Sequence, residues 1–200
     1  MKRNFFQFTF NISFLLFFVS ILCFSLNVVF NLTNPSKKIA DVSLVLFNKN
    51  FSTTVITYIH RIAILTSSTA LSLIAVEVIS RIRKDSLLNY AKSIYQTFRM
   101  RYFLRQYHST PTETTVSPKG NHYYNPILKS FNHAVSKCVV DIRKEKTIVL
   151  LNVPNTQQAQ KLLEERIESI QKEITSRHPH YYFSAPNRIG NKLWFIGTRR

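Results

Sequence analysis

Two histidines separated by a single proline, His178 and His180, are the residues of this sequence whose spacing could present a pair of imidazoles to a metal ion. No third ligand is evident near them. Cys23 and Cys138 lie far apart in the chain, and a structural zinc site needs four ligands. We therefore interpret His178-Pro179-His180 as a turn that ends a helix, and we expect neither a metal nor another cofactor.

The catalytic motifs that depend on fixed spacing are missing from the sequence. It has no glycine-rich phosphate loop, no G-x-S-x-G turn and no H-E-x-x-H pair. Asp141 is the one aspartate between residues 122 and 200, and Glu164, Glu165 and Glu168 fall on the polar face of a predicted helix. This pattern predicts a protein that is not an enzyme.

The formal net charge of +17 favours an anionic or acidic partner. One basic set falls on the predicted turns and C-terminus of the last domain: Arg143, Lys144, Lys146, Arg188, Lys192, Arg199 and Arg200. If both turns lie at one end of the predicted sheet, these residues form a patch with Tyr181, Tyr182 and Trp194 nearby. Such a patch would bind a protein partner or, in the alternative, nucleic acid; a merely soluble basic surface is the third interpretation.

A second basic set accompanies a predicted amphipathic helix over residues 84–108. Leu87, Ala91, Ile94 and Phe98 draw one apolar stripe along it, and tyrosines interleave with the cations. Aromatic and basic residues on one helix are typical of an interfacial helix on an anionic leaflet. Stacking on single-stranded nucleic acid and packing against a partner helix are the alternatives. The candidate lipid contacts are Arg81, Arg83, Lys84, Lys92, Arg99, Arg101 and Arg105.

Two long apolar segments precede this helix. Residues 1–33 and 61–83 are each long enough to cross a bilayer as a helix. A signal peptide is the rival interpretation of the first, but its apolar run is too long and lacks a small-residue cleavage site. Within the second, Glu77 and Arg81 are one helical turn apart, which predicts a local ion pair.

The distribution of Lys and Arg predicts the orientation. More of them follow the second apolar segment than lie between the two segments, so both termini are expected in the cytoplasm and residues 34–60 form an external loop. Residues 109–121 combine prolines, a glycine and many hydroxyl side chains, which is typical of a linker.

The remaining residues, 122–200, are predicted to form a small basic α+β domain with the order α-β-β-α-β-β. Its clearest element is a helix ending at His178, with Ala159, Leu163, Ile167, Ile170 and Ile174 on one face. Asn155 and Gln158 have the spacing of a capping box at its start. The β-rich runs pair naturally into a mostly antiparallel sheet under a layer of helices.

These features together predict a non-enzymatic cell-membrane subunit or adaptor with two spans, part of a secretion, DNA-transfer or envelope complex. Its partners would be an anionic inner leaflet and a second protein or another copy of the chain. A membrane-tethered nucleic-acid-binding protein is the alternative, and a small transporter or holin-like pore former is a weaker one, because two spans form a pore only by oligomerising.

Overall fold

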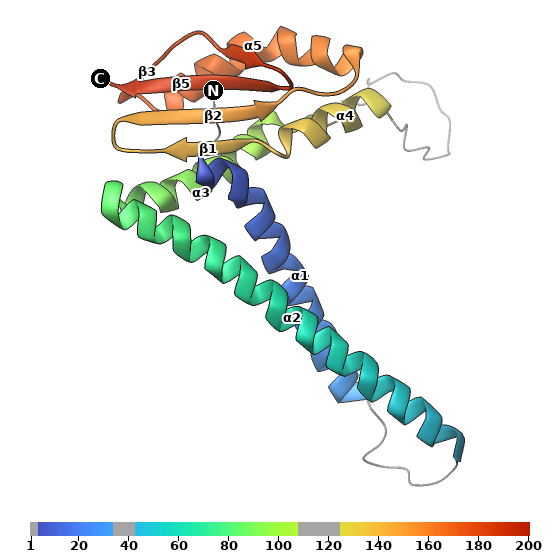
Figure 1. The fold of residues 1–200 in the computed structure, drawn as a ribbon. Coiled ribbons are helices and arrows are strands. Elements are labelled where there is room, and N and C mark those ends of the chain that lie inside the picture. Colours follow the sequence, from blue (N-terminus) through green and yellow to red (C-terminus); the bar gives the residue numbers. More distant parts are fainter. Residues whose placement is uncertain (1–3, 34–42, 108–124) are drawn as a thin grey trace, which may run out of the picture. The chain divides into compact units, whose positions relative to one another are not determined.

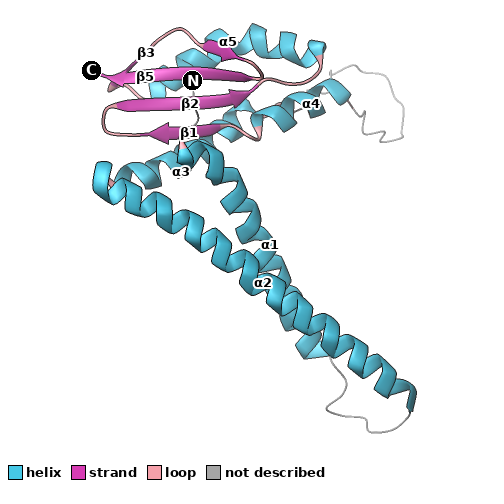
Figure 2. Cartoon of the chain, viewed as in Figure 1, coloured by secondary structure: helices cyan, strands magenta, loops and turns pink. Residues whose placement is uncertain are grey.

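The computed structural model describes residues 4–33, 43–107 and 125–200, which fall into two compact units, Asn4–Ser80 and Arg81–Arg200 (Figures 1 and 2). The predicted linker at 109–121 lies outside the described residues. Each unit is considered by itself below.

The first unit contains helix α1 (Phe5–Thr33) and most of helix α2 (Ser43–Lys84). Both contain a stretch, Phe5–Phe30 and Thr54–Lys84, that is long and apolar enough to cross a membrane by length and composition. Small residues lie at the buried positions, with Ala63 and Ala70 of α2 fully buried. The Phe24 ring of α1 meets the His60 ring of α2 edge to face, with centroids 6.2 Å apart.

Helix α2 differs from the prediction at its start. It begins at Ser43, so residues 43–60 of the predicted external loop are helical, and residues 34–42 lie outside the described residues. The stretch from Ser43 to His60 contains neither glycine nor proline, so nothing in it opposes continuing the helix towards the N-terminus. The prediction placed the boundary where the apolar run ends, which marks the limit of hydrophobicity and not of helix.

The second unit is an antiparallel sheet with three helices. Its helices are α3 (Leu87–Leu104), α4 (Pro126–Val135) and α5 (Gln157–Arg177). Its strands are β1 (Val139–Ile142), β2 (Lys146–Asn152), β3 (Tyr181–Phe183), β4 (Asn187–Ile189) and β5 (Lys192–Arg199). The strand order is β1-β2-β5-β3, and β4 also pairs with β5, so the predicted helix layer and antiparallel sheet are confirmed.

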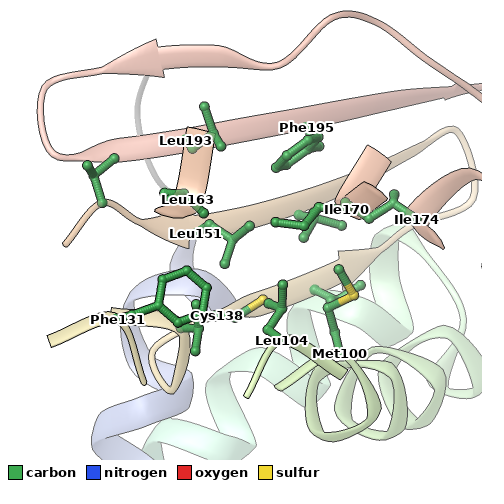
Figure 3. Close-up of a cluster of buried hydrophobic side chains, with 14 of the residues drawn as sticks. Met100, Leu104, Phe131, Cys138, Leu151, Leu163, Ile170, Ile174, Leu193 and Phe195 are labelled. Atoms are coloured by element: carbon green, nitrogen blue, oxygen red, sulfur yellow. The ribbon is translucent and has the colours of Figure 1, made fainter. Parts of the chain in front are cut away.

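One face of the sheet carries the main core (Figure 3). Strand residues Val149, Leu151, Leu193 and Phe195 meet the apolar stripe of α5 and Phe131 of α4. The stripe is buried as predicted at Ala159, Leu163, Ile170 and Ile174, while Ile167 is partly buried. Alternation along β2 and β5 directs Ile148, Leu150 and Trp194 to the opposite face, where they form a second cluster.

Helix α3 belongs to this unit. Its Met100 and Leu104 are each 2% exposed and join the main core. The compact unit therefore begins at Arg81, ahead of the domain start predicted at residue 122. The linker composition of 109–121 suggested a boundary there, but long-range packing connects the elements on either side of it.

Local signals account for most element ends. The Ser86 hydroxyl accepts from the Leu88 amide at the start of α3, and the Asn125 carboxamide caps α4 ahead of Pro126. The predicted capping box of α5 is wrong, because Thr156 is the N-cap and makes no side-chain cap bond. Strand β4 was not predicted; Gly190, at a φ of 58°, allows the tight turn that folds it onto β5.

Candidate functional site

Helix α3 lies along the free edge of β1 and bonds it through side chains. The Thr97 hydroxyl accepts from the Val140 amide at 3.0 Å, and the Ser93 hydroxyl accepts from the Ile142 amide at 2.9 Å. Each hydroxyl has one hydrogen, which it donates to a carbonyl one turn back in the helix, Ser93 O for Thr97 at 2.7 Å. The two hydroxyls thus connect helix carbonyls to strand amides.

Two arginines complete the outward-facing groups of this strand. Arg101 Nε donates to the Cys138 carbonyl and Arg81 Nη1 to the Ile142 carbonyl, each at 2.8 Å. The spacing fits: residues four apart on a helix rise about 6 Å, and alternate residues of a strand are separated by about 6.7 Å. Ser93, Thr97 and Arg101 can therefore follow one strand edge. Such an edge would otherwise be open to pairing with another chain.

The face of α3 turned away from β1 is apolar. Its inner face carries Ser93 and Thr97, both fully buried, whereas Leu88 is 72% exposed and Tyr102 is 75% exposed. The exposed apolar and aromatic side chains of this outer face are Leu87, Leu88, Tyr95, Phe98 and Tyr102. A helix in water normally buries its apolar stripe and exposes its polar one. Here the relation is reversed, which marks the outer face as a surface for a non-aqueous or protein environment.

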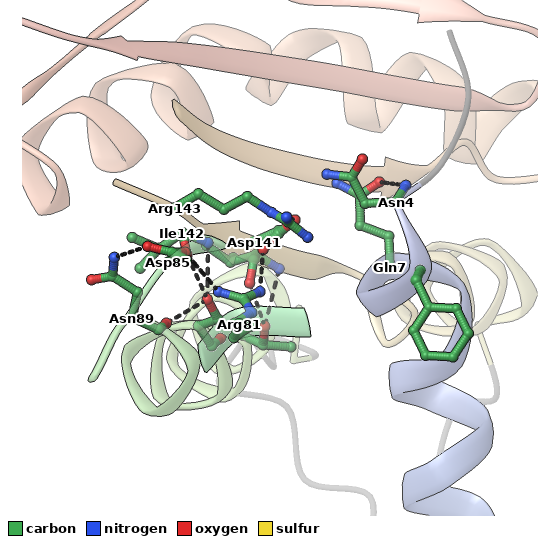
Figure 4. Close-up of polar contacts among 12 residues, drawn as sticks. Asn4, Gln7, Arg81, Asp85, Asn89, Asp141, Ile142 and Arg143 are labelled. Atoms are coloured by element: carbon green, nitrogen blue, oxygen red, sulfur yellow. Dashed lines mark hydrogen bonds and ion pairs between the residues drawn. The ribbon is translucent and has the colours of Figure 1, made fainter. Parts of the chain in front are cut away.

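A buried ionic network holds the last turn of α2 to the sheet (Figure 4). Arg81 is 1% exposed, and its Nη2 bonds Asp141 of β1, whose other carboxylate oxygen accepts from Arg143 Nε at 3.1 Å. Arg81 Nη1 also lies 3.5 Å from Asp85, and its guanidinium stacks over the Tyr90 ring, 5.5 Å from the centroid. Paired and hydrogen-bonded in this way, a buried charge is tolerated; without its partner it costs about 3–5 kcal/mol.

The same network fixes the turn between β1 and β2. One Asp85 carboxylate oxygen accepts from the Lys144 amide at 3.1 Å and from the Asn89 side chain at 2.7 Å. The Tyr181 hydroxyl donates to the Arg143 carbonyl at 2.8 Å. The turn, the end of α2 and the start of α3 therefore meet at one end of the sheet.

The seven-residue basic patch predicted for this domain divides in two. Lys146 of β2 pairs with Thr198, at one end of the sheet, while Asn152 pairs with Lys192, at the other. Because β2 runs the full length between the two turns, Arg143, Lys144, Lys146, Arg199 and Arg200 lie at the first end, and Arg188 and Lys192 at the second. The condition for a single patch, both turns at one end, is therefore wrong.

Other details weaken the second half of that patch. Arg188 donates to Gln160 at 3.2 Å and lies 3.8 Å from a Glu164 oxygen, so α5 partly engages it. Trp194 is 3% exposed and offers no ring face for stacking, whereas Tyr182 is 67% exposed.

The predicted lipid contacts also fall into two groups. Arg81 and Arg101 are engaged in bonds to β1, and the Arg101 pKa is lowered by burial, partly offset by the Cys138 thiol. We therefore remove these two from the predicted set. Arg83, Lys84, Lys92, Arg99 and Arg105 are exposed. The Glu77–Arg81 ion pair stays a prediction.

Two further titratable groups are buried. Burial raises the pKa of the Cys138 thiol to about 12, an effect that Arg101 partly opposes. Burial, reinforced by Arg177, lowers the pKa of His178 to about 4; its ring packs against Tyr181 and Phe183, with centroids 6.3 and 6.1 Å away. Both groups are thus uncharged packing elements at neutral pH. Among the described residues, no group of three His, Cys, Asp or Glu side chains could hold a metal ion.

Sequence reasoning missed the residues that organise this site. Ser93 and Thr97 were read as the polar background of an apolar stripe, and Asp141 was noted only for its rarity. A detectable signal was present: Asn89, Ser93, Thr97 and Arg101 recur every four residues on one face of α3. Comparisons of this chain with protein-family models, with curated proteins and with solved structures found no match.

Proposed function

We propose that this protein is a non-enzymatic adaptor anchored in the cell membrane, part of a secretion, DNA-transfer or envelope complex. Its two apolar helices would span the bilayer with both termini in the cytoplasm, and the unit Arg81–Arg200 would bind a second protein at the membrane surface.

The observation that carries the proposal is the reversed amphipathicity of α3. The candidate span in α2 ends at Lys84, and α3 begins at Leu87, so its outer face starts within a few residues of the bilayer. Tyrosines and leucines with flanking Lys92 and Arg99 suit the boundary between headgroups and acyl chains. With the outer face in that boundary and the inner face on β1, both faces of α3 would be satisfied.

The span itself agrees with this placement. Residues 62–80 of α2 contain one ionisable side chain, Glu77, and at 1.5 Å per residue they cover about 28 Å, close to a hydrocarbon core of about 30 Å. Arg81, Arg83 and Lys84 would then lie at headgroup level, and the Arg81 network would fasten the sheet directly to the end of the span.

The partner-binding surface we favour is the outer edge of β3 and β4. Helix α3 covers the β1 edge, whereas in the described part of the chain β3 and β4 pair only with β5. Tyr182 and Ile189, 67% and 41% exposed, stand on this edge. An extended segment of another protein could add to it as a further strand, with these two side chains contributing selectivity.

In-cell photo-crosslinking of the full-length protein tests the proposal. A photoreactive amino acid at Tyr182 or Ile189 should give a discrete protein adduct, and the same group at Arg166, exposed on α5, should not. Alkaline carbonate washing of the same membranes should leave the chain in the pellet. Release by carbonate, or the same adducts from all three positions, would contradict the proposal.

The alternative, a membrane-tethered nucleic-acid-binding protein, draws on the net charge of +17 and on the cations gathered at one end of the sheet. The division of the basic patch and the burial of Trp194 make it the weaker candidate. Salt-sensitive, high-affinity binding of an oligonucleotide by the full-length chain in detergent would favour it over the adaptor.

A further inference from the structure

Five exposed cations from three parts of the second unit meet where α2 ends. Arg83 and Lys84 close α2, Lys144 and Lys146 flank the β1–β2 turn, and Arg199 ends β5. We call these five residues the junction cluster. They are separated by more than a hundred residues in the sequence, and only the fold brings them together.

Backbone contacts fix the members of the cluster beside one another. The Lys144 amide donates to Asp85, the residue that follows Lys84, at 3.1 Å. The Arg199 amide donates to the Glu145 carbonyl at 2.9 Å, inside the same turn, and Lys146 pairs with Thr198. Glu145 is the exposed acidic residue of the turn, while Asp85 and Asp141 are engaged by Arg81.

We propose that the junction cluster binds the headgroups of anionic phospholipids in the leaflet that the C-terminal end of α2 reaches. The inference rests on the membrane anchoring proposed above and goes beyond it, because anchoring alone requires no lipid selectivity. It extends the lipid-facing set from the helices to the β1–β2 turn and β5, which carry the sheet itself onto the headgroups.

Charge and position favour a lipid over a soluble anion. Arg83 and Lys84 directly follow the apolar stretch of α2, so in an inserted chain they lie at headgroup depth, and the contacts above hold Lys144 at the same level. Ammonium and guanidinium groups bind phosphate oxygens, and each cation near an anionic surface strengthens attachment roughly fivefold. Several cations at one level outcompete the single Glu145 carboxylate.

The experiment uses the full-length chain in detergent micelles with short-chain lipid probes. Native mass spectrometry would measure the affinity for dihexanoyl phosphatidylglycerol and, separately, for dihexanoyl phosphatidylcholine. The test variant removes three cations of the sheet end: Lys144→Gln, Lys146→Gln and Arg199→Gln. The matched control removes the same charge from exposed positions of α5: Lys161→Gln, Arg166→Gln and Lys172→Gln.

The wild type should prefer the glycerol lipid, the test variant should lose about tenfold or more of that affinity, and the control should stay within about twofold. The pair Arg83→Gln and Lys84→Gln, on a different element, should weaken the same binding and keeps the test valid if the triple variant folds poorly. Equal losses in test and control variants would overturn the proposal, as would equal affinity for the two lipids.

Two further arms separate the remaining outcomes. Displacement of the lipid by inorganic phosphate, or tighter binding of a single-stranded oligonucleotide at the same residues, would replace the lipid assignment. Carbonate washing separates the two proposals: a chain released from membranes contradicts the anchored adaptor, whereas a retained chain without lipid preference contradicts the junction cluster alone.

Discussion

Removing the two hydroxyls that connect α3 to β1 should expose the strand edge without changing the shape of the core. Thr97→Val is nearly isosteric, and Ser93→Ala removes a single oxygen atom. Both hydroxyls are fully buried, so the Val140 and Ile142 amides would each face an apolar group in place of an acceptor. A buried amide left unsatisfied costs about 1–3 kcal/mol, which gives about 2–6 kcal/mol for the double variant.

The assay is hydrogen exchange of the full-length protein in detergent, followed at peptides that contain residues 138–142. A loss of about 1–3 kcal/mol at one amide corresponds to exchange that is roughly 5- to 150-fold faster. Peptides from α5 should keep their exchange rates unless the whole unit is destabilised, and chemical unfolding measures that global part.

Thr175→Val is the matched control. Thr175 is exposed on α5, and its hydroxyl donates to the Gln171 carbonyl one turn back, as Thr97 does to Ser93, but it meets no strand amide. Its replacement should change stability by about 0.5 kcal/mol or less. If Thr97→Val behaves like Thr175→Val, with β1 exchange unchanged, the hydroxyls do not hold the edge and the reasoning is refuted.

Three other perturbations have defined outcomes. Arg81→Gln leaves Asp141 buried beside a neutral partner and should destabilise unfolding by about 3–5 kcal/mol, while exposed Arg83→Gln should cost less than about 0.5 kcal/mol in the same denaturant titration. His178, with its pKa lowered from 6.5 to about 4, stays neutral in the folded state while the unfolded chain takes up a proton, so stability should fall by roughly 3 kcal/mol as the pH drops from 6.5 to 4; unfolding curves of His178→Gln should lack most of that slope. Cys138, with its pKa raised to about 12, should resist alkylation at pH 8 until denaturant is added, and rapid labelling of the native protein would place the thiol outside the core.

Period and composition were sufficient for the local elements. The stripe from Ala159 to Ile174 predicts α5 because residues three and four apart share one face of a helix, whatever they pack against. Strands β1 and β2 follow from short β-branched runs separated by a polar turn. The two candidate spans follow from length and hydrophobicity alone.

Where pairing or helix continuity decides, the sequence was a poorer guide. Strand β4 spans only three residues, all exposed, and exists because Gly190 folds it back on β5. The start of α2 at Ser43 depends on backbone propensity, which hydropathy does not report.

The sequence by itself determined which residues are cationic, apolar or β-branched and which segments are helical, because these are properties of single residues and of their near neighbours. The tertiary structure decided which face of α3 is inside. Its apolar stripe predicts burial, yet Ser93 and Thr97 are buried because the open edge of β1 needs hydrogen-bond partners more than the core needs another apolar helix. It likewise divided the basic patch and brought Arg81 to Asp141, since an antiparallel register relates residues that no local pattern connects.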